Sequence, residues 1–205
     1  MLGMGFPRRA DDAADSSLTQ RGFVWVETEP GVCAIGRWEN VQLIVWWSQA
    51  TGPAVDRLTK VTRESCAQHR MLSNIHIIKD KARVPTSEAR DGFVRLMNDY
   101  ANQLANVAVV VGGVGFWASM MRSAVTGMRV LAPRSFELRL HGEVDEILGW
   151  LPHAHAYRCG STLPREALSG MLMAATSCLQ SGSVEVSTPP LSMRPQSLTV
   201  PRAKR

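Results

Sequence analysis

The sequence predicts an α/β domain with a mixed sheet, and three observations lead to this prediction. Short apolar segments follow one another closely near the start, as in an antiparallel meander. Further on, apolar strands alternate with segments of helical periodicity, as in βαβ units with parallel strands. A glycine turn from Gly112 to Gly115 separates one such strand from the next helix. We expect the order βββαβαβαβα, with helices packed on the sheet and one additional C-terminal helix.

The first half of the chain supplies the meander and the first βα unit. The third strand is apolar on both faces except at Gln42, which places it inside the sheet. The helix after it carries apolar residues at intervals of three and four. The expected strands are Phe23 to Thr28, Val32 to Trp38, Val41 to Ser48 and Asn74 to Lys79, with a helix from Pro53 to His69 before the last of them.

The second half is expected to add two more strands and four helices. Pro85 suits the first position of a helix, and Pro152 suits the end of one, so His153 and His155 are expected in a loop. The expected helices are Pro85 to Leu104, Phe116 to Met128, Val144 to Leu151 and Pro164 to Leu179, with strands at 107–111 and from Phe136 to Leu140.

Composition divides the chain into four parts. Residues 1–20 are small and polar and are expected to be a disordered lead, and residues 21–158 form the α/β domain. Residues 159–180 hold the extra helix, which would cover an edge or face of the domain or pair with a copy of itself. Residues 181–205 are rich in serine, proline and basic residues and are expected to be a disordered tail.

Charge and cysteine usage limit the classes of partner. The formal net charge is +5, but part of the excess lies in the tail, so nucleic acid is not an expected partner. The four cysteines form no C-x-x-C pair, and no metal site or cofactor is expected. The longest near-apolar run, 107–118, is too short to cross a bilayer. We therefore expect a cytoplasmic protein with a protein partner, and a homodimer stays open.

The segment around the start of the second helix is the first candidate site. Thr86 and Ser87 place two hydroxyls on a helix N-terminus, where a phosphate would be stabilised by free N–H groups and the dipole. Arg83 and Arg90 could pair with that charge. The neighbouring residues Pro85 and Glu88 complete the expected contact loop. The alternative is that these hydroxyls only cap the helix.

The glycine turn is a weaker candidate. Gly113 to Ala118 fits the loose form G-x-G-x-x-A between a strand and a helix, so Gly113 and Gly115 are candidates for binding an anion or ligand. The acidic residue that such a fingerprint needs about 20 residues on is misplaced, because Glu137 lies near the start of its strand. The alternative is a tight turn that needs glycine for its backbone geometry.

Five stretches of the second half carry a resemblance beyond the order of the elements: Ala108 to Val111, Met120 to Arg122, Thr126 to Met128, Phe136 to Leu138 and Glu143 to Leu148. In these stretches and in its layout, the chain resembles the STAS domain family, including its SpoIIAA-like branch, over about residues 32–151. In that family a helix ends at a glycine before a short strand. A regulatory serine lies in an Asp-Ser-Ser-Gly loop, where this chain has Pro85-Thr86-Ser87-Glu88. The resemblance implies a non-catalytic module that acts through protein contacts, sometimes through a small ligand.

Three hypotheses of function follow. The first is a non-catalytic regulatory or protein-interaction domain, switched by phosphorylation at Thr86 or Ser87. The second is a binder of a small apolar or acidic ligand, which would use the aromatic side chains of the sheet and the helix start at Gly115. The third is an enzyme or nucleotide binder around Gly113 and Gly115.

Overall fold

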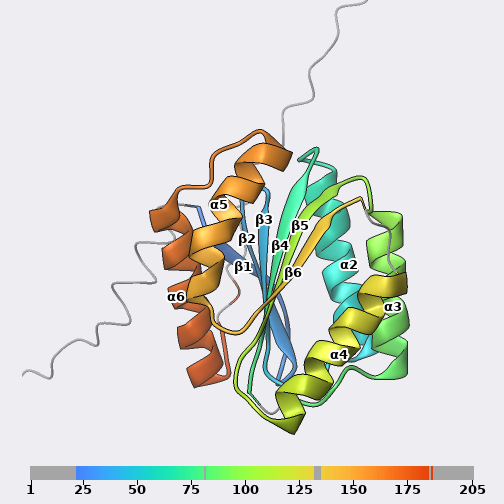
Figure 1. Ribbon diagram of the computed structural model, residues 1–205. Helices are drawn as coiled ribbons and strands as arrows, with labels where there is room; N and C mark the ends of the chain where they lie inside the picture. The colour runs from blue at the N-terminus through green and yellow to red at the C-terminus, as the bar shows by residue number, and fades with distance from the viewer. Residues whose placement is uncertain (1–21, 81, 132–134, 185, 187–205) are drawn as a thin grey trace, which may run out of the picture.

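A six-stranded sheet lies between two layers of helices (Figure 1). The computed structural model describes residues 22–80, 82–131, 135–184 and 186. The strands are β1 Val24–Glu29, β2 Cys33–Trp38, β3 Val41–Trp46, β4 Leu72–Ile78, β5 Leu104–Val111 and β6 Glu137–His141. The helices are α2 Gly52–Cys66, α3 Ser87–Asp99, α4 Phe116–Leu131, α5 Asp145–Cys159 and α6 Arg165–Ser181. The predicted α/β class and element order are confirmed.

The strands lie in the sheet in the same order as in the chain, from β1 to β6. The first three form an antiparallel meander, and Glu39, which has a φ of 47°, turns the chain between β2 and β3. From β3 onward all pairs are parallel. Every residue of β3 is buried, as its apolar pattern predicts for a strand covered on both faces.

Helices α2, α3 and α4 cover one face of the sheet, and α5 and α6 cover the other (Figure 1). We call these the α4 face and the α6 face. A separate apolar core lies on each. On the α4 face, Leu58 of α2, Leu96 of α3 and Met121 of α4 pack against alternate residues of the strands. On the α6 face, Leu151 of α5 and Leu168 of α6 pack against the other set.

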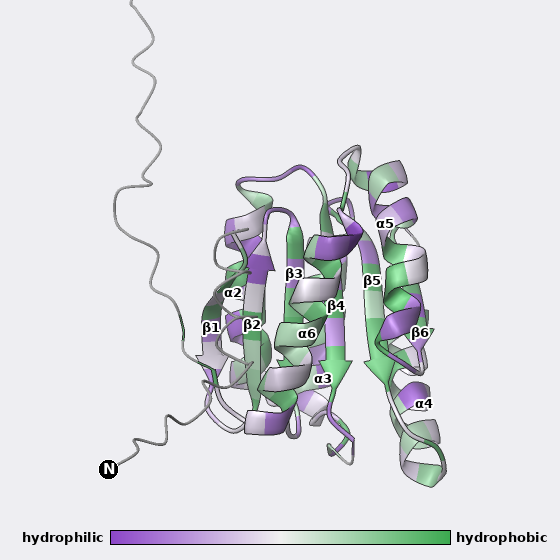
Figure 2. Ribbon diagram, turned by 90° about the vertical axis from the view of Figure 1, so that its left-hand side faces the viewer, coloured by the Kyte–Doolittle hydropathy of each residue, from purple (hydrophilic) through white to green (hydrophobic). Residues whose placement is uncertain are grey.

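The last helix, α6, is an integral part of this core. Figure 2 shows it crossing in front of β3 and β4, whose hydrophobic residues it covers. Leu168 and Met171 are fully buried, and the indole of Trp47 donates a hydrogen bond to the carbonyl oxygen of Cys178. Of the two placements the sequence left open, the structure shows that α6 covers a face of the domain.

The start and end of α3 differ from the predicted helix at Pro85 to Leu104. The helix begins at Ser87, because the Thr86 hydroxyl accepts a hydrogen bond from the backbone N–H of Ala89 and so caps it. It ends at Asp99, and Leu104 instead opens β5, where it pairs with Leu72 of β4. Pro85 therefore precedes the helix.

Helix α5 is longer than predicted, and the expectation that Pro152 ends it is wrong. The helix runs to Cys159, so His153 and His155 are helical and do not lie in a loop. Proline removes one backbone hydrogen bond within a helix. The second half is held in place by His155, whose ring nitrogens contact Ser73 Oγ at 2.8 Å and Ser161 Oγ at 3.0 Å.

Helix α4 also runs further than predicted. It continues through Gly127 to Leu131, so the helix does not end at that glycine as the STAS resemblance implies. The predicted disordered lead and most of the predicted tail lie outside the described residues; Ser181, the tail's first residue, is the last residue of α6.

Candidate functional site

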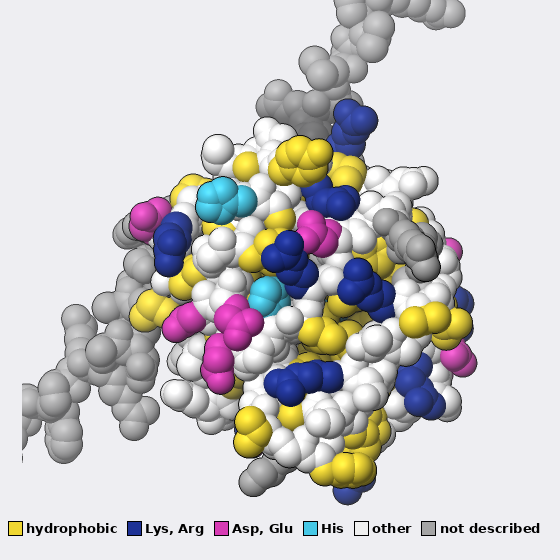
Figure 3. All heavy atoms as spheres, viewed as in Figure 1, with side chains coloured by type: hydrophobic (Ala, Val, Ile, Leu, Met, Phe, Trp, Pro, Cys, Tyr) yellow, Lys and Arg dark blue, Asp and Glu magenta, His cyan; other side chains and the backbone are white. Residues whose placement is uncertain are grey.

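An apolar cavity lies on the α4 face, between the sheet and helices α3 and α4. Strands β3, β4 and β5 form its floor, and its volume is about 80 Å³. A single buried water needs roughly 10–15 Å³, so the cavity has room for several waters or for part of a small ligand. Its apolar walls include Trp46, Phe93, Leu104, Val109, Met121 and Val125. Figure 3 shows hydrophobic side chains at the bottom of a hollow on this side, bordered by Lys and Arg side chains.

Strand β4 supplies two polar groups to this cavity. Asn74 and His76 alternate with Ile75 and Ile77, so they share the α4 face while the isoleucines pack on the α6 face. Asn74 is 1 % exposed, and its Oδ1 makes no hydrogen bond with any of the residues described. A buried polar atom without a partner is rare and costly, which marks this atom as a candidate contact for a ligand.

His76 is held in one orientation by an aromatic cluster. Its Nδ1 accepts a hydrogen bond from Trp46 Nε1 at 3.2 Å, and Phe93 packs edge-on against both rings. Burial lowers the pKa of His76 from its ordinary 6.5 to about 4, so the ring is neutral at pH 7. A neutral imidazole that accepts at Nδ1 carries its proton on Nε2 and can donate there.

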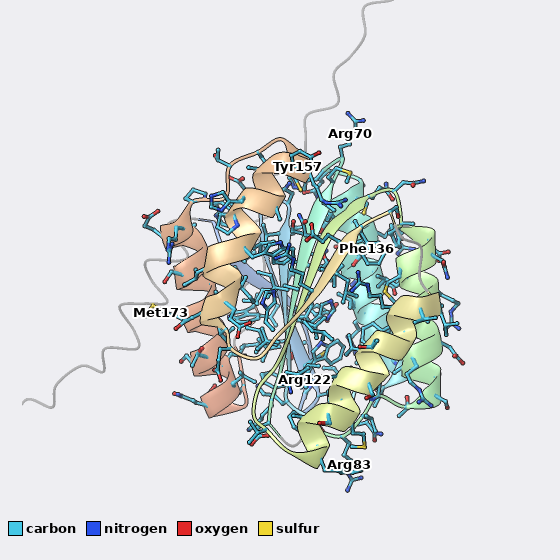
Figure 4. The ribbon with its side chains drawn as sticks, viewed as in Figure 1. Arg70, Arg83, Arg122, Phe136, Tyr157 and Met173 are labelled. Carbon is cyan, nitrogen blue, oxygen red and sulfur yellow. The ribbon has the colours of Figure 1, made fainter. Side chains whose placement is uncertain are left out.

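The predicted contact loop forms part of the cavity lining. Arg83 and Pro85 line the cavity, together with Ser48, which follows β3. Arg83 projects from the domain below α4 (Figure 4), and it makes no ion pair with any described residue. Arg122, in contrast, is fixed, because its Nη2 donates to the carbonyl oxygens of Val111 and Gly113.

The other residues of that loop lie at the start of α3. Thr86 is half-buried, and its hydroxyl caps the helix, whereas Ser87 next to it is exposed. Glu88 is exposed, but its carboxyl group lies against Gly52 at the first residue of α2. Arg90 is exposed on α3. The structure therefore brings Arg83 and Pro85 to the cavity and leaves Ser87 and Arg90 on the surface.

The glycine turn is separate from the cavity lining. Gly113 and Gly115 have φ values of 78° and 90°, which other residues rarely adopt. A Cβ at Gly113 would lie 3.3 Å from Asp80 Oδ1, so a carboxylate occupies the space beside it. A negative charge there disfavours a bound phosphate. The geometry favours the conformational role of these glycines, and an anion site there stays a prediction.

The four cysteines are protonated thiols at neutral pH. Burial raises the pKa of Cys33 and Cys178 to about 12 and that of Cys66 to about 11, and it also raises the pKa of Cys159. Because the thiolate is the nucleophile, none of these thiols is activated for attack. Within the described ranges, no three metal-binding side chains come together as a metal site.

Sequence reasoning missed Asn74 and His76. The available signal was two polar residues at alternate positions of an otherwise apolar strand, which places both on one buried face.

Among the described residues, no helix combines the length and the hydrophobicity that crossing a bilayer requires. No protein-family model and no curated protein matches this sequence.

Proposed function

We propose that this chain is a non-catalytic regulatory domain that binds a small apolar molecule with an acidic group in the cavity on the α4 face. The observation that carries this proposal is a cavity walled by apolar side chains, with an unpartnered buried oxygen at Asn74. Ligand sites typically combine such walls with a few well-placed polar groups. The regulatory role follows from the STAS resemblance, which stays a prediction.

The position of Arg83 supports the acidic group. It is the one cation among the described residues that line the cavity, and its side chain is exposed to solvent. His76 is neutral at pH 7 and does not attract an anion. An acid would therefore keep its carboxylate beside the exposed Arg83, where it remains partly hydrated, and place part of its apolar body in the cavity. Burying the charge would cost far more than this arrangement.

Ligand binding is tested by melting the protein with a panel of alkyl and aryl carboxylates. A ligand that binds only the folded chain raises the melting temperature with concentration, adding about 2.7 kcal/mol at 100 times its Kd. Val125→Phe places a ring in the cavity and should abolish the shift in melting temperature. Met173→Phe changes an exposed side chain of α6 and should leave the shift intact. Arg83→Gln should weaken the binding of carboxylates and leave the binding of the matching alcohols unchanged. The absence of any shift across the panel would refute ligand binding.

The same loop supports a protein contact. Arg83 and Pro85 border the cavity, and the exposed hydroxyl of Ser87 follows them at the start of α3. A ligand that orders this loop would change the surface offered to a partner, and phosphate on Ser87 would act on the same surface. Ser87→Glu should change the set of proteins captured from lysate, whereas Ser119→Glu, at an exposed position of α4, should not change it. Identical captures would remove the loop as a contact site.

A further inference from the structure

The polar end of the cavity indicates which chemical group the ligand carries there. Asn74 Oδ1 is an acceptor without a partner among the described residues. His76 Nε2 lies two residues further on the same face, carries the ring proton and makes no hydrogen bond with the described part of the chain. The site thus offers an acceptor at Asn74 Oδ1 and a donor at His76 Nε2, and neither group is charged.

The neighbouring strand shows that the fold satisfies such groups elsewhere. Gln42 of β3 is the direct partner of Asn74 in the sheet and lies on the same face. Its Nε2 donates to Ser65 Oγ at 3.0 Å, and its Oε1 accepts from Thr62 Oγ1 at 3.1 Å. Helix α2 therefore supplies both partners that Gln42 needs. Over Asn74 the corresponding space is the cavity.

A second orphaned amide gives the matched comparison. Asn106 Oδ1 is also buried without a partner in the described chain, but its Nδ2 donates to Ser73 Oγ in the network around His155 on the α6 face. Asn106 does not line the cavity. Of these two buried amides, only Asn74 therefore lies beside space that a ligand could occupy.

We propose that the ligand is a hydroxylated carboxylate, whose hydroxyl group donates to Asn74 Oδ1 and accepts from His76 Nε2–H while its carboxylate lies beside the exposed Arg83. A hydroxyl is both donor and acceptor, so it matches the two groups at once. An ammonium group has no acceptor for His76 and would bury a charge, and a carboxylate has no donor for Asn74 Oδ1 and would also bury a charge. This inference rests on the proposed ligand-binding function and specifies its substrate class.

The spacing of the polar groups sets the length of the ligand. Asn74 and Ile78, the last residue of β4, line the cavity together with Arg83. From Asn74 to Ile78 the strand advances by four residues at about 3.3 Å each, or roughly 13 Å. An eight-carbon chain or a phenylpropanoate is of suitable length. The aliphatic and aromatic ligands differ in shape. Testing both therefore separates the contribution of the hydroxyl group to affinity from the contribution of the apolar part.

The test is isothermal titration of the full chain with two pairs of probes. The pairs are 8-hydroxyoctanoate with octanoate, and 3-(4-hydroxyphenyl)propanoate with 3-phenylpropanoate. In at least one pair the hydroxylated member should bind about 10- to 100-fold more tightly, because the hydrogen-bonding site rejects an analogue that leaves it unpaired. Equal affinity within both pairs would overturn the hydroxyl assignment and leave ligand binding standing. No binding by any probe would count against both.

Variants locate the preference at the two polar groups. Asn74→Leu should remove the difference within the pair, and Asn74→Ala serves if the leucine variant does not fold. His76→Phe keeps the aromatic packing and removes the donor, so it should reduce the preference. Asn106→Ala, on the other face, is the matched control and should retain it. A preference that survives Asn74→Leu, or disappears in Asn106→Ala, would overturn the assignment.

Discussion

Gln42 and Asn74 lie side by side on one face of the sheet, yet their surroundings differ. Gln42 sits beneath α2, where seven residues of the helix are buried and two hydroxyls complete the amide. Asn74 faces the cavity beneath α3 and α4, and three residues of α4 are buried. On this face, the part of the sheet beneath α2 is closely packed, whereas the part beneath α3 and α4 borders a cavity.

The largest expected effect comes from removing each amide in turn. Gln42→Leu should lower the free energy of unfolding by roughly 2–4 kcal/mol, since it strands the hydroxyls of Thr62 and Ser65. Asn74→Leu should change it by less than about 1 kcal/mol or raise it, because it fills space and removes an unpaired oxygen. Urea unfolding measures both. Equal losses would mean that the two environments are energetically alike.

A second comparison concerns His155 on the α6 face. Both of its ring nitrogens have partners, and burial lowers its pKa to about 4. In the unfolded chain His155 takes up a proton near pH 6.5, whereas in the folded chain it does so only near pH 4. The contribution of neutral His155 to the free energy of unfolding is therefore fully present above pH 6.5 and is lost as the pH falls towards 4. The loss should be roughly 2–3 kcal/mol for this group. His76 contributes in the same direction.

Urea unfolding between pH 7.5 and pH 4.5 measures this loss. His155→Gln should be less stable at pH 7.5 and should show a shallower decline. A variant that declines as steeply as the wild type would show that the proton is taken up elsewhere.

The smallest expected effect separates the two neighbouring hydroxyls at the start of α3. Thr86→Ala removes the capping acceptor for the N–H of Ala89 and should cost about 1 kcal/mol. Ser87→Ala is exposed and should stay within about 0.5 kcal/mol. Thermal melting of the two variants compares them. If Ser87 proves the costlier substitution, the capping role belongs to it.

Much of the fold could be predicted from the sequence because hydrophobic periodicity reports burial directly. The all-apolar third strand and the helical spacing in the α2 segment are examples. Pro152 misled the prediction, because tertiary contacts of Leu151 and His155 outweigh one lost helical hydrogen bond. The start of α3 was predicted at Pro85, because proline favours the first position of a helix. The helix begins two residues later, because the hydroxyl of Thr86 caps it.

The site was less predictable than the fold. The sequence identified the loop with Arg83 and Pro85, which borders the cavity. It gave no means of identifying the cavity itself, because a gap depends on how closely helices approach a sheet. The residues Met121 and Val125 have the same pattern whether they touch the strands or stand away from them. Asn74 becomes informative only when its missing partner is known.

The order of strands from β1 to β6 has a consequence for how the chain reaches this structure. Each new strand pairs with the edge left by the one before it, so the sheet can grow during synthesis without any strand being inserted later. Helix α6 is the exception, because it follows all six strands in the chain and packs on β3, near the middle of the sheet. The part of the α6 face over β3 therefore stays uncovered until α6 has been synthesised, and the partly folded chain with these strands exposed is the species that most needs protection from aggregation.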